Sequence, residues 1–129
     1  LFVSSSEDGG ASWGRYRRTG LWGYPADLVT LGDGRLLAAY GHRRDPIGIK
    51  VAVSDDGLEW NEENAREIYR PPNLTNDDGR PAAGLDSGYR HIGYPSAVVL
   101  DDGSVRVAFH SFDETTRKQI VLIASFEVA

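Results

Sequence analysis

The chain has 129 residues, enough for about one domain, and its 40% hydrophobic and 26% charged residues are normal for a globular protein. Its formal charge of −5 argues against nucleic acid and anionic membrane surfaces as partners, and no apolar run is long enough to span a membrane. The lack of cysteine excludes disulfides, thiolate metal sites and a thiol nucleophile. The three histidines show no metal-ligand spacing, and the sequence has no GxGxxG or P-loop motif, so we expect no metal and no other cofactor.

The first twenty residues begin within an expected strand, without an initial Met, a basic segment or an apolar leader. We therefore expect a piece of a longer protein, and the compartment stays open. Residues 5–13 read SSEDGGASW, and residues 54–60 repeat the pattern as SDDGLEW. Ser6 and Ser54 are 48 positions apart, which is the first sign of an internal repeat.

The segment after Gly23 alternates short apolar runs with turns. We expect strands at 26–31, 35–40 and 49–54, with a Gly-Asp-Gly turn after the first and a longer loop, 41–48, after the second. A fourth strand is expected to begin at Trp60. An Asp-Gly pair between apolar runs favours a hairpin, because the turn needs residues that tolerate positive φ.

The same order returns from Gly93, 70 positions after Gly23, where GYPSAVVLDDGSVRVAFH matches GYPADLVTLGDGRLLAAY. Strands are expected at 96–100, 104–110 and 119–125, with a turn at 101–103 and a loop at 111–117. The two offsets differ because a polar stretch rich in Pro and Asn lies between Trp60 and Gly93. Without that insertion, one period of about 48 residues explains the chain.

A period near 48 with four strands in each unit is typical of a β-propeller blade. We therefore predict an all-β partial propeller of about two and a half four-stranded antiparallel blades. Residues 1–20 would end one blade, 21–70 form a full blade, 71–91 form an insertion and 92–129 form a final partial blade. About nine strands are too few to close a ring. The alternative is an antiparallel sandwich, which does not require a repeat.

The repeated turn motif resembles the Asp box (BNR repeat) of the sialidase (neuraminidase) superfamily. The residues that carry the resemblance are Ser6, Asp8, Gly10 and Trp13 in the first box and Ser54, Asp56, Gly57 and Trp60 in the second. The resemblance covers almost the whole chain except about 61–88. It implies a six-bladed propeller in which this chain supplies C-terminal blades and packs on N-terminal blades of the parent chain. Asp boxes also occur in receptors and other non-catalytic propellers.

We interpret the boxes as structural turns. Asp and Ser side chains can accept hydrogen bonds from nearby backbone N–H groups, and Gly can take the positive-φ position. Trp would plug the turn against its sheet. The rival interpretation makes Asp8 and Asp56 catalytic carboxylates.

Strand order predicts that the boxes and the short turns share one face. The longer loops and the segments ending at Tyr24 and Tyr94 share the opposite face, where we expect function. The residues expected there are Trp22, Tyr24, His42, Arg43, Arg44, Asp45, Asp86, Arg90, His91, Tyr94 and His110.

The resemblance implies that arginines on this face bind the carboxylate of an acidic sugar, since a guanidinium makes a planar two-pronged contact and stays charged. Arg43, Arg44 and Arg90 are the candidates. Solvated surface arginines, with Arg44 paired to Asp45, are the alternative. Trp22 and Tyr24 are candidates for contact with the sugar, and inter-blade packing is the alternative for Trp22.

The resemblance also implies a tyrosine nucleophile, which a carboxylate must activate because the tyrosine pKa is ordinarily near 10. Tyr94 stands just before an expected innermost strand. The same Gly-Tyr-Pro occurs at Tyr24, so blade framework is the alternative role. The expected function is the C-terminal part of an exo-glycosidase acting on terminal sialic acid or a related acidic sugar. A non-catalytic propeller binding glycan or protein, or a fragment inactive alone, are the alternatives.

Overall fold

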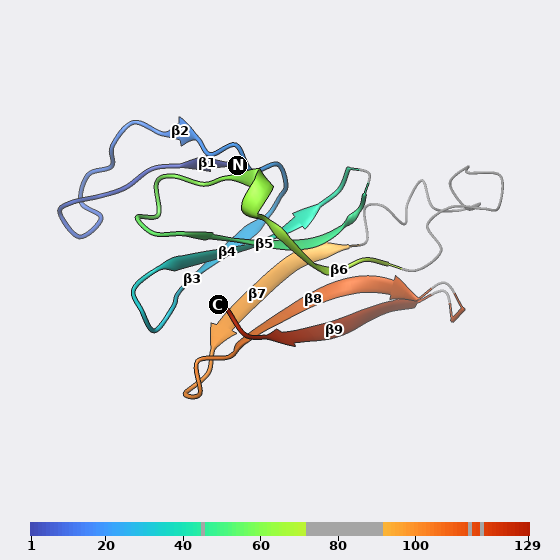
Figure 1. Ribbon diagram of the computed structural model, residues 1–129. Coiled ribbons are helices and arrows are strands. Elements are labelled where there is room, and N and C mark those ends of the chain that lie inside the picture. The colour runs from blue at the N-terminus through green and yellow to red at the C-terminus, as the bar shows by residue number, and fades with distance from the viewer. Residues whose placement is uncertain (45, 72–91, 114, 117) are drawn as a thin grey trace.

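A computed structural model describes residues 1–44, 46–71, 92–113, 115–116 and 118–129. The described chain is all-β apart from one 3-10 turn and forms three antiparallel sheets of two, four and three strands (Figure 1). The first sheet holds β1 (Phe2–Val3) and β2 (Arg17–Arg18). The second holds β3 (Ala26–Thr30), β4 (Leu36–His42), β5 (Gly48–Ser54) and β6 (Arg66–Tyr69). The third holds β7 (Gly93–Val99), β8 (Val105–Asp113) and β9 (Lys118–Phe126).

The strands of each sheet are neighbours in chain order, and the sheets of two, four and three strands together supply the nine strands that the sequence predicts. The repeat is visible in the short turns as well. In turn 31–35 the first N–H donates to the last carbonyl at 2.8 Å, and turn 100–104 makes the same bond at the same distance. Gly34 and Gly103 have φ of 91° and 81°. The Asp-Gly hairpins thus have equivalent backbones 69 positions apart.

The fourth strand of the middle sheet begins later than predicted, at Arg66 and not at Trp60. A short 3-10 helix, η1 (Glu62–Asn64), stands between them, and the Asn61 side chain caps it by accepting a hydrogen bond from the Glu63 N–H at 2.9 Å. Asn followed by two Glu is a helix-start pattern. The local turn therefore delays the strand, and it carries Glu62 to the site described below.

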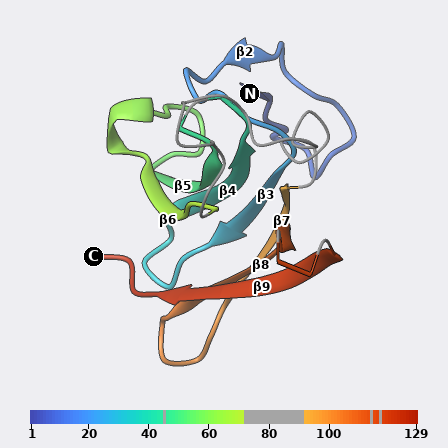
Figure 2. The same ribbon diagram turned by 90° about the vertical axis from the view of Figure 1, so that its right-hand side faces the viewer.

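Both faces of the middle sheet are covered, which explains why β4 and β5 are apolar almost throughout. One face packs toward the third sheet through Leu37, Ala39, Ile49 and Val51. The other packs toward the first sheet through a cluster that contains Leu21, Ala38, Tyr40 and Ala52. Figure 2 shows the first and third sheets on opposite sides of the middle one.

The first strands of the two repeats, β3 and β7, lie close together and are joined across the sheets. The Ala97 N–H donates to Asp27 Oδ2 at 2.7 Å; counted back from the hairpin turn, Asp27 corresponds to Ser96 of the third sheet, the residue before Ala97. Because Asp27 is partly buried, this charge-assisted bond is stronger than a neutral one. It fixes how the third sheet sits on the middle sheet.

The outer face of the third sheet carries exposed apolar side chains beside the polar Arg106 and Ser125. Val98, Val121 and Ile123 are 49%, 74% and 66% exposed. Strand β9 alternates between inward and outward side chains, and both sets are largely apolar. In the part of the chain that the structure describes, no helix is long and apolar enough to cross a membrane.

Candidate functional site

The first Asp box is a closed network of short hydrogen bonds. Ser6 Oγ donates to Asp8 Oδ1 at 2.7 Å and accepts from the Gly10 N–H at 2.8 Å. Asp8 also accepts from the Ser12 N–H at 2.9 Å and the Ser12 hydroxyl at 2.6 Å. The hydrogen bonds from Ser12 and Ser6 hold the pKa of Asp8 far below its ordinary value. With both carboxylate oxygens used by its own loop, Asp8 fixes a turn, which supports the structural interpretation.

The second box follows the same plan on the middle sheet. Asp56 Oδ1 accepts from the backbone N–H groups of Leu58 and Glu59, both at 2.8 Å, and Ser54 Oγ accepts from the Gly57 N–H at 2.9 Å. Trp60 Nε1 donates to the Gly57 carbonyl at 2.9 Å, and its ring packs on the cluster around Ala38 and Tyr40. This tryptophan closes the turn against its sheet as expected.

Trp13 differs from that expectation, because it is 67% exposed and does not plug its turn. Its box lies in the loop between β1 and β2, which form a sheet of only two strands. In the described residues, that narrow sheet offers no broad apolar face for the ring to cover. The plug role predicted for Trp13 is therefore not seen among the described residues.

The box carboxylates predict a pH dependence of stability. Hydrogen bonds from the Glu59 and Leu58 N–H groups and from Ser54 hold the pKa of Asp56 below its ordinary value. Its stabilising effect is therefore complete above the unfolded-state pKa, about 4, and is lost as the pH falls through the folded-state value. Asp56→Asn should lower the melting temperature of the full-length protein at pH 7, and the difference from wild type should shrink as the pH drops below about 4.

Thermal melts at pH 7 and pH 3 check this. Asp55→Asn is the matched control, because the Asp55 carboxylate accepts no hydrogen bond within the described chain, and it should change the melting temperature little. An Asp56→Asn effect that is equally large at both pH values would contradict the argument.

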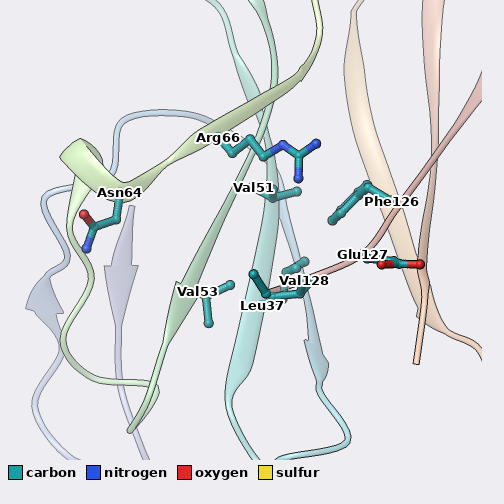
Figure 3. Close-up of a pocket in the computed structure, with 9 residues that line it drawn as sticks. Leu37, Val51, Val53, Asn64, Arg66, Phe126, Glu127 and Val128 are labelled. Carbon is teal, nitrogen blue, oxygen red and sulfur yellow. The ribbon is translucent and has the colours of Figure 1, made fainter. Parts of the chain in front are cut away.

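An apolar groove of about 210 Å³ lies near the end of the middle sheet that carries the second Asp box (Figure 3). Leu37, Val51 and Val53 line it from the middle sheet, and Phe126 and Val128 line it from the end of the chain. The Arg66 guanidinium lies 5.6 Å from the centre of the Phe126 ring. Since its walls are the packing faces of two sheets, the groove belongs to the core and not to a catalytic centre.

The opposite end of the sheets gathers the side chains expected at a functional site. The Tyr24 N–H donates to the Gly41 carbonyl at 3.0 Å, and Gly93 pairs with His110 in the β7–β8 ladder. These contacts place Tyr24, at the start of the first repeat, beside the end of β4, and Gly93, at the start of the second, beside β8. We call the resulting group the aromatic–arginine cluster; it consists of Trp22, Tyr24, His42, Arg43, Arg44, Tyr94 and His110.

Arg43 lies at the centre of this cluster. Its guanidinium is 4.9 Å from the centre of the Tyr24 ring and 5.7 Å from that of Tyr94. Its Nε donates to the Ile92 carbonyl at 3.0 Å, whereas Nη2 is buried without a hydrogen-bond partner. No carboxylate in the described ranges forms an ion pair with it. Arg43 is therefore held by two rings and a carbonyl, and its charge is not neutralised by a described residue.

Gly93 permits this approach of Arg43. Its φ is 135°, a left-handed value that favours glycine, and a Cβ there would lie 3.1 Å from Arg43 Nη2. A larger residue would strain the backbone and shift the guanidinium by a few tenths of an ångström.

Trp22 forms the second part of the cluster. Its ring meets His42 edge to face at 5.5 Å and Tyr24 at 6.0 Å. The exposed Arg44 lies over the Trp22 ring, 3.8 Å from its centre. A sugar stacking on that face of Trp22 would have to displace Arg44. The predicted Arg44–Asp45 pair lies partly outside the described residues, because Asp45 is not among them.

Tyr94 is exposed and has an unusual backbone. It is 65% exposed, it stacks on His110 at 5.3 Å, and its φ is 50°. Among the described residues it is the one non-glycine with positive φ. Such conformations cost about 1–3 kcal/mol and concentrate at functional sites. Tyr24, which is 52% exposed, does not share this backbone, so the structure distinguishes the two Gly-Tyr-Pro stretches.

The remaining predicted site residues lie outside the described ranges: Asp86, Arg90 and His91. Within those ranges, no three His, Asp or Glu side chains converge as metal ligands would. The structure adds Glu62, a residue that sequence reasoning missed. Its carboxylate reaches Trp22, Tyr40 and Lys50, and the partners lie up to 40 positions away, so no local pattern could indicate it.

One solved structure is similar to this chain. A solved structure of a protein of unknown function from Dyadobacter fermentans DSM 18053 is similar, with a TM-score of 0.66 and 27% sequence identity. The similarity covers 99% of this chain and 31% of that one, so this chain spans about a third of its neighbour's length. No family model matches the chain. No curated protein matches it either.

Proposed function

We propose that this chain forms adjoining blades of a sialidase-like propeller. The support is the equivalence of the two repeats, with matching turns at 31–35 and 100–104 and two Asp boxes with the same hydrogen-bond plan. The closeness of β3 and β7 fits first strands arranged around a common axis. The exposed apolar face at Val98, Val121 and Ile123 fits a further blade packed there, because a monomer rarely leaves such a face open.

We further propose that the full-length protein is an exo-glycosidase acting on terminal sialic acid or a related acidic sugar. One observation carries this proposal, namely the partly buried guanidinium of Arg43, which no described carboxylate neutralises. A charge in such a place is costly unless it has a partner. The carboxylate of a sugar is a fitting partner, since it can accept the remaining guanidinium N–H groups in one plane. Trp22, Tyr24 and Tyr94 would form the walls around the sugar ring.

Tyr94 is the proposed nucleophile. Its hydroxyl oxygen would attack the anomeric carbon as the bond to the leaving oxygen breaks, with the proton for that oxygen coming from an acid outside this chain. Water would then cleave the tyrosyl–sugar bond, so the configuration is retained. A neutral tyrosine is not repelled by the substrate carboxylate as a carboxylate nucleophile would be. A base must still remove the hydroxyl proton, and the described residues place no carboxylate on it.

That last observation also favours a second candidate, a non-catalytic propeller that binds an acidic glycan through Arg43. A binding protein needs the cation and the aromatic walls, but it needs neither nucleophile nor base.

The deciding experiment is a substrate panel with the full-length protein. Aryl glycosides of sialic acid and glucuronic acid should be hydrolysed or bound, whereas the methyl esters of the same sugars and a neutral aryl glucoside should be neither. Binding of the acids without turnover would select the second candidate. Equal binding or equal hydrolysis of the acids, the esters and the neutral sugar would contradict both candidate functions.

A further inference from the structure

The Glu62 carboxylate accepts hydrogen bonds from several elements of the fold. Its Oε1 accepts from Lys50 Nζ at 2.8 Å, and its Oε2 accepts from the Tyr40 hydroxyl at 3.2 Å and from the Trp22 N–H at 3.1 Å. His42 Nε2 lies 4.0 Å from Oε1. Glu62 therefore links η1, the middle sheet and the segment that enters the aromatic–arginine cluster.

The partners of Glu62 need it because they are buried. Tyr40 is fully buried and the side chain of Lys50 is 16% exposed, so a hydroxyl and an ammonium group would otherwise lack an acceptor. Burial alone would raise the pKa of Glu62, but the hydrogen bonds from Lys50, Trp22 and Tyr40 outweigh it and keep the pKa below its ordinary value. Burial and the charge of Glu62 raise the pKa of Tyr40, so its hydroxyl stays a donor.

The segment that Glu62 holds is the one that carries the aromatic walls. Gly23 lies directly on the Tyr40 ring, where a Cβ would overlap the ring and come within 2.7 Å of the Gly41 carbonyl oxygen. Tyr40 is in turn fixed by Glu62, and the Trp22 N–H is bonded to the same carboxylate. Residues 22–24 are thus held at two consecutive points, the Trp22 N–H by Glu62 and Gly23 by the Tyr40 ring. The rings of Trp22 and Tyr24, on which Arg44 and Arg43 lie, leave from this supported segment.

We infer that Glu62 is a positioning residue of the aromatic–arginine cluster, which sets the Trp22 and Tyr24 rings in place before a ligand arrives. Any effect of Glu62 on ligand binding rests on the proposed acidic-sugar site. Aromatic rings that are already in place lose less conformational entropy when the sugar binds. Its effect on the Trp22 ring does not depend on the nature of the ligand. The two consequences can therefore be tested separately.

The ligand-independent test is ¹⁹F NMR of the full-length protein labelled with 5-fluorotryptophan, with the Trp22 signal assigned by its loss in Trp22→Phe. Glu62→Ala should shift or broaden the Trp22 signal and leave the Trp13 signal unchanged, because Trp13 lies in the distant first box. Glu62→Gln keeps an acceptor oxygen for the Trp22 N–H and should largely restore the wild-type signal. Glu63→Ala, an exposed neighbour on the same turn, is the control and should move neither.

The ligand test measures the affinity of the same variants for methyl α-glycosides of sialic and glucuronic acid. Glu62→Ala should weaken the binding that wild type shows by about tenfold or more, and Glu62→Gln by less. If wild type binds neither sugar, the acidic-sugar site fails while the ¹⁹F result still decides the role of Glu62. An unchanged Trp22 signal in Glu62→Ala would overturn that role. So would a loss of native Trp13 and Trp22 signals together in both Glu62 variants, since that marks a general structural support.

Discussion

Replacing Arg43 with alanine in the full-length protein is expected to weaken the binding of an acidic sugar by about 100-fold or more. A hydrogen bond to a charged group contributes about 1.5–3 kcal/mol, and a planar carboxylate–guanidinium contact makes two. Since about 1.4 kcal/mol corresponds to a tenfold change in affinity, the loss of one such contact reaches this range. Isothermal titration calorimetry with the sugar that the substrate panel selects measures it.

Two variants control this result. Arg43→Lys keeps the charge but loses the planar fork and the Nε bond to Ile92, so it should recover only a small part of the affinity. Arg35→Ala removes another arginine, which pairs with Asp33 at 2.8 Å on the opposite end of the sheet, and should leave binding unchanged. Wild-type affinity in a folded Arg43→Ala protein would remove the basis of the proposed function.

Tyr94→Phe is expected to lower kcat on an aryl sialoside or glucuronide by about 10³-fold or more, while substrate affinity changes little. The substitution removes only the hydroxyl oxygen that would form the bond to the anomeric carbon, and losses of nucleophiles or proton-transfer groups are commonly of this size. The ring, its stacking on His110 and its contact with Arg43 all remain. Steady-state kinetics with the aryl sialoside or glucuronide measure kcat and KM separately.

Tyr24→Phe is the matched comparison, because Tyr24 shares the Gly-Tyr-Pro sequence and the contact with Arg43 but lacks the positive φ. It should retain kcat within about tenfold. Undiminished turnover in Tyr94→Phe would reject Tyr94 as nucleophile, and a large loss in Tyr24→Phe alone would transfer that role to Tyr24.

The three sheets could be predicted because their signals are local. Asp33-Gly34 and Asp102-Gly103 mark hairpins by their own backbone preferences, and the 69-residue offset between them places the second set from the first. The start of β6 could not be placed by the same means. An Asn61 cap and a 3-10 turn compete with the strand there, and the strand pattern after Trp60 does not show which of them wins.

The candidate site was predictable only as far as strand order decides it. Alternation of the chain between two ends of the sheets is enough to bring Trp22, Tyr24, Arg43 and Tyr94 to one end. It does not show that Nη2 of Arg43 lacks a partner or that Tyr94 has positive φ, because both depend on packing between repeats. Glu62 was missed for the same reason, since its partners come together only after the middle sheet has formed.

The bond from the Ala97 N–H to Asp27 gives the repeat a polarity. Each junction of this kind needs a carboxylate on one unit and only a backbone donor on the next. The register of the strands puts Ser96 of the third sheet where the middle sheet has Asp27, so the third sheet receives this link but has no carboxylate with which to pass it on. The linkage is therefore one-directional and ends at the third sheet. Anyone extending the array by copying a unit should copy the one that contains Asp27.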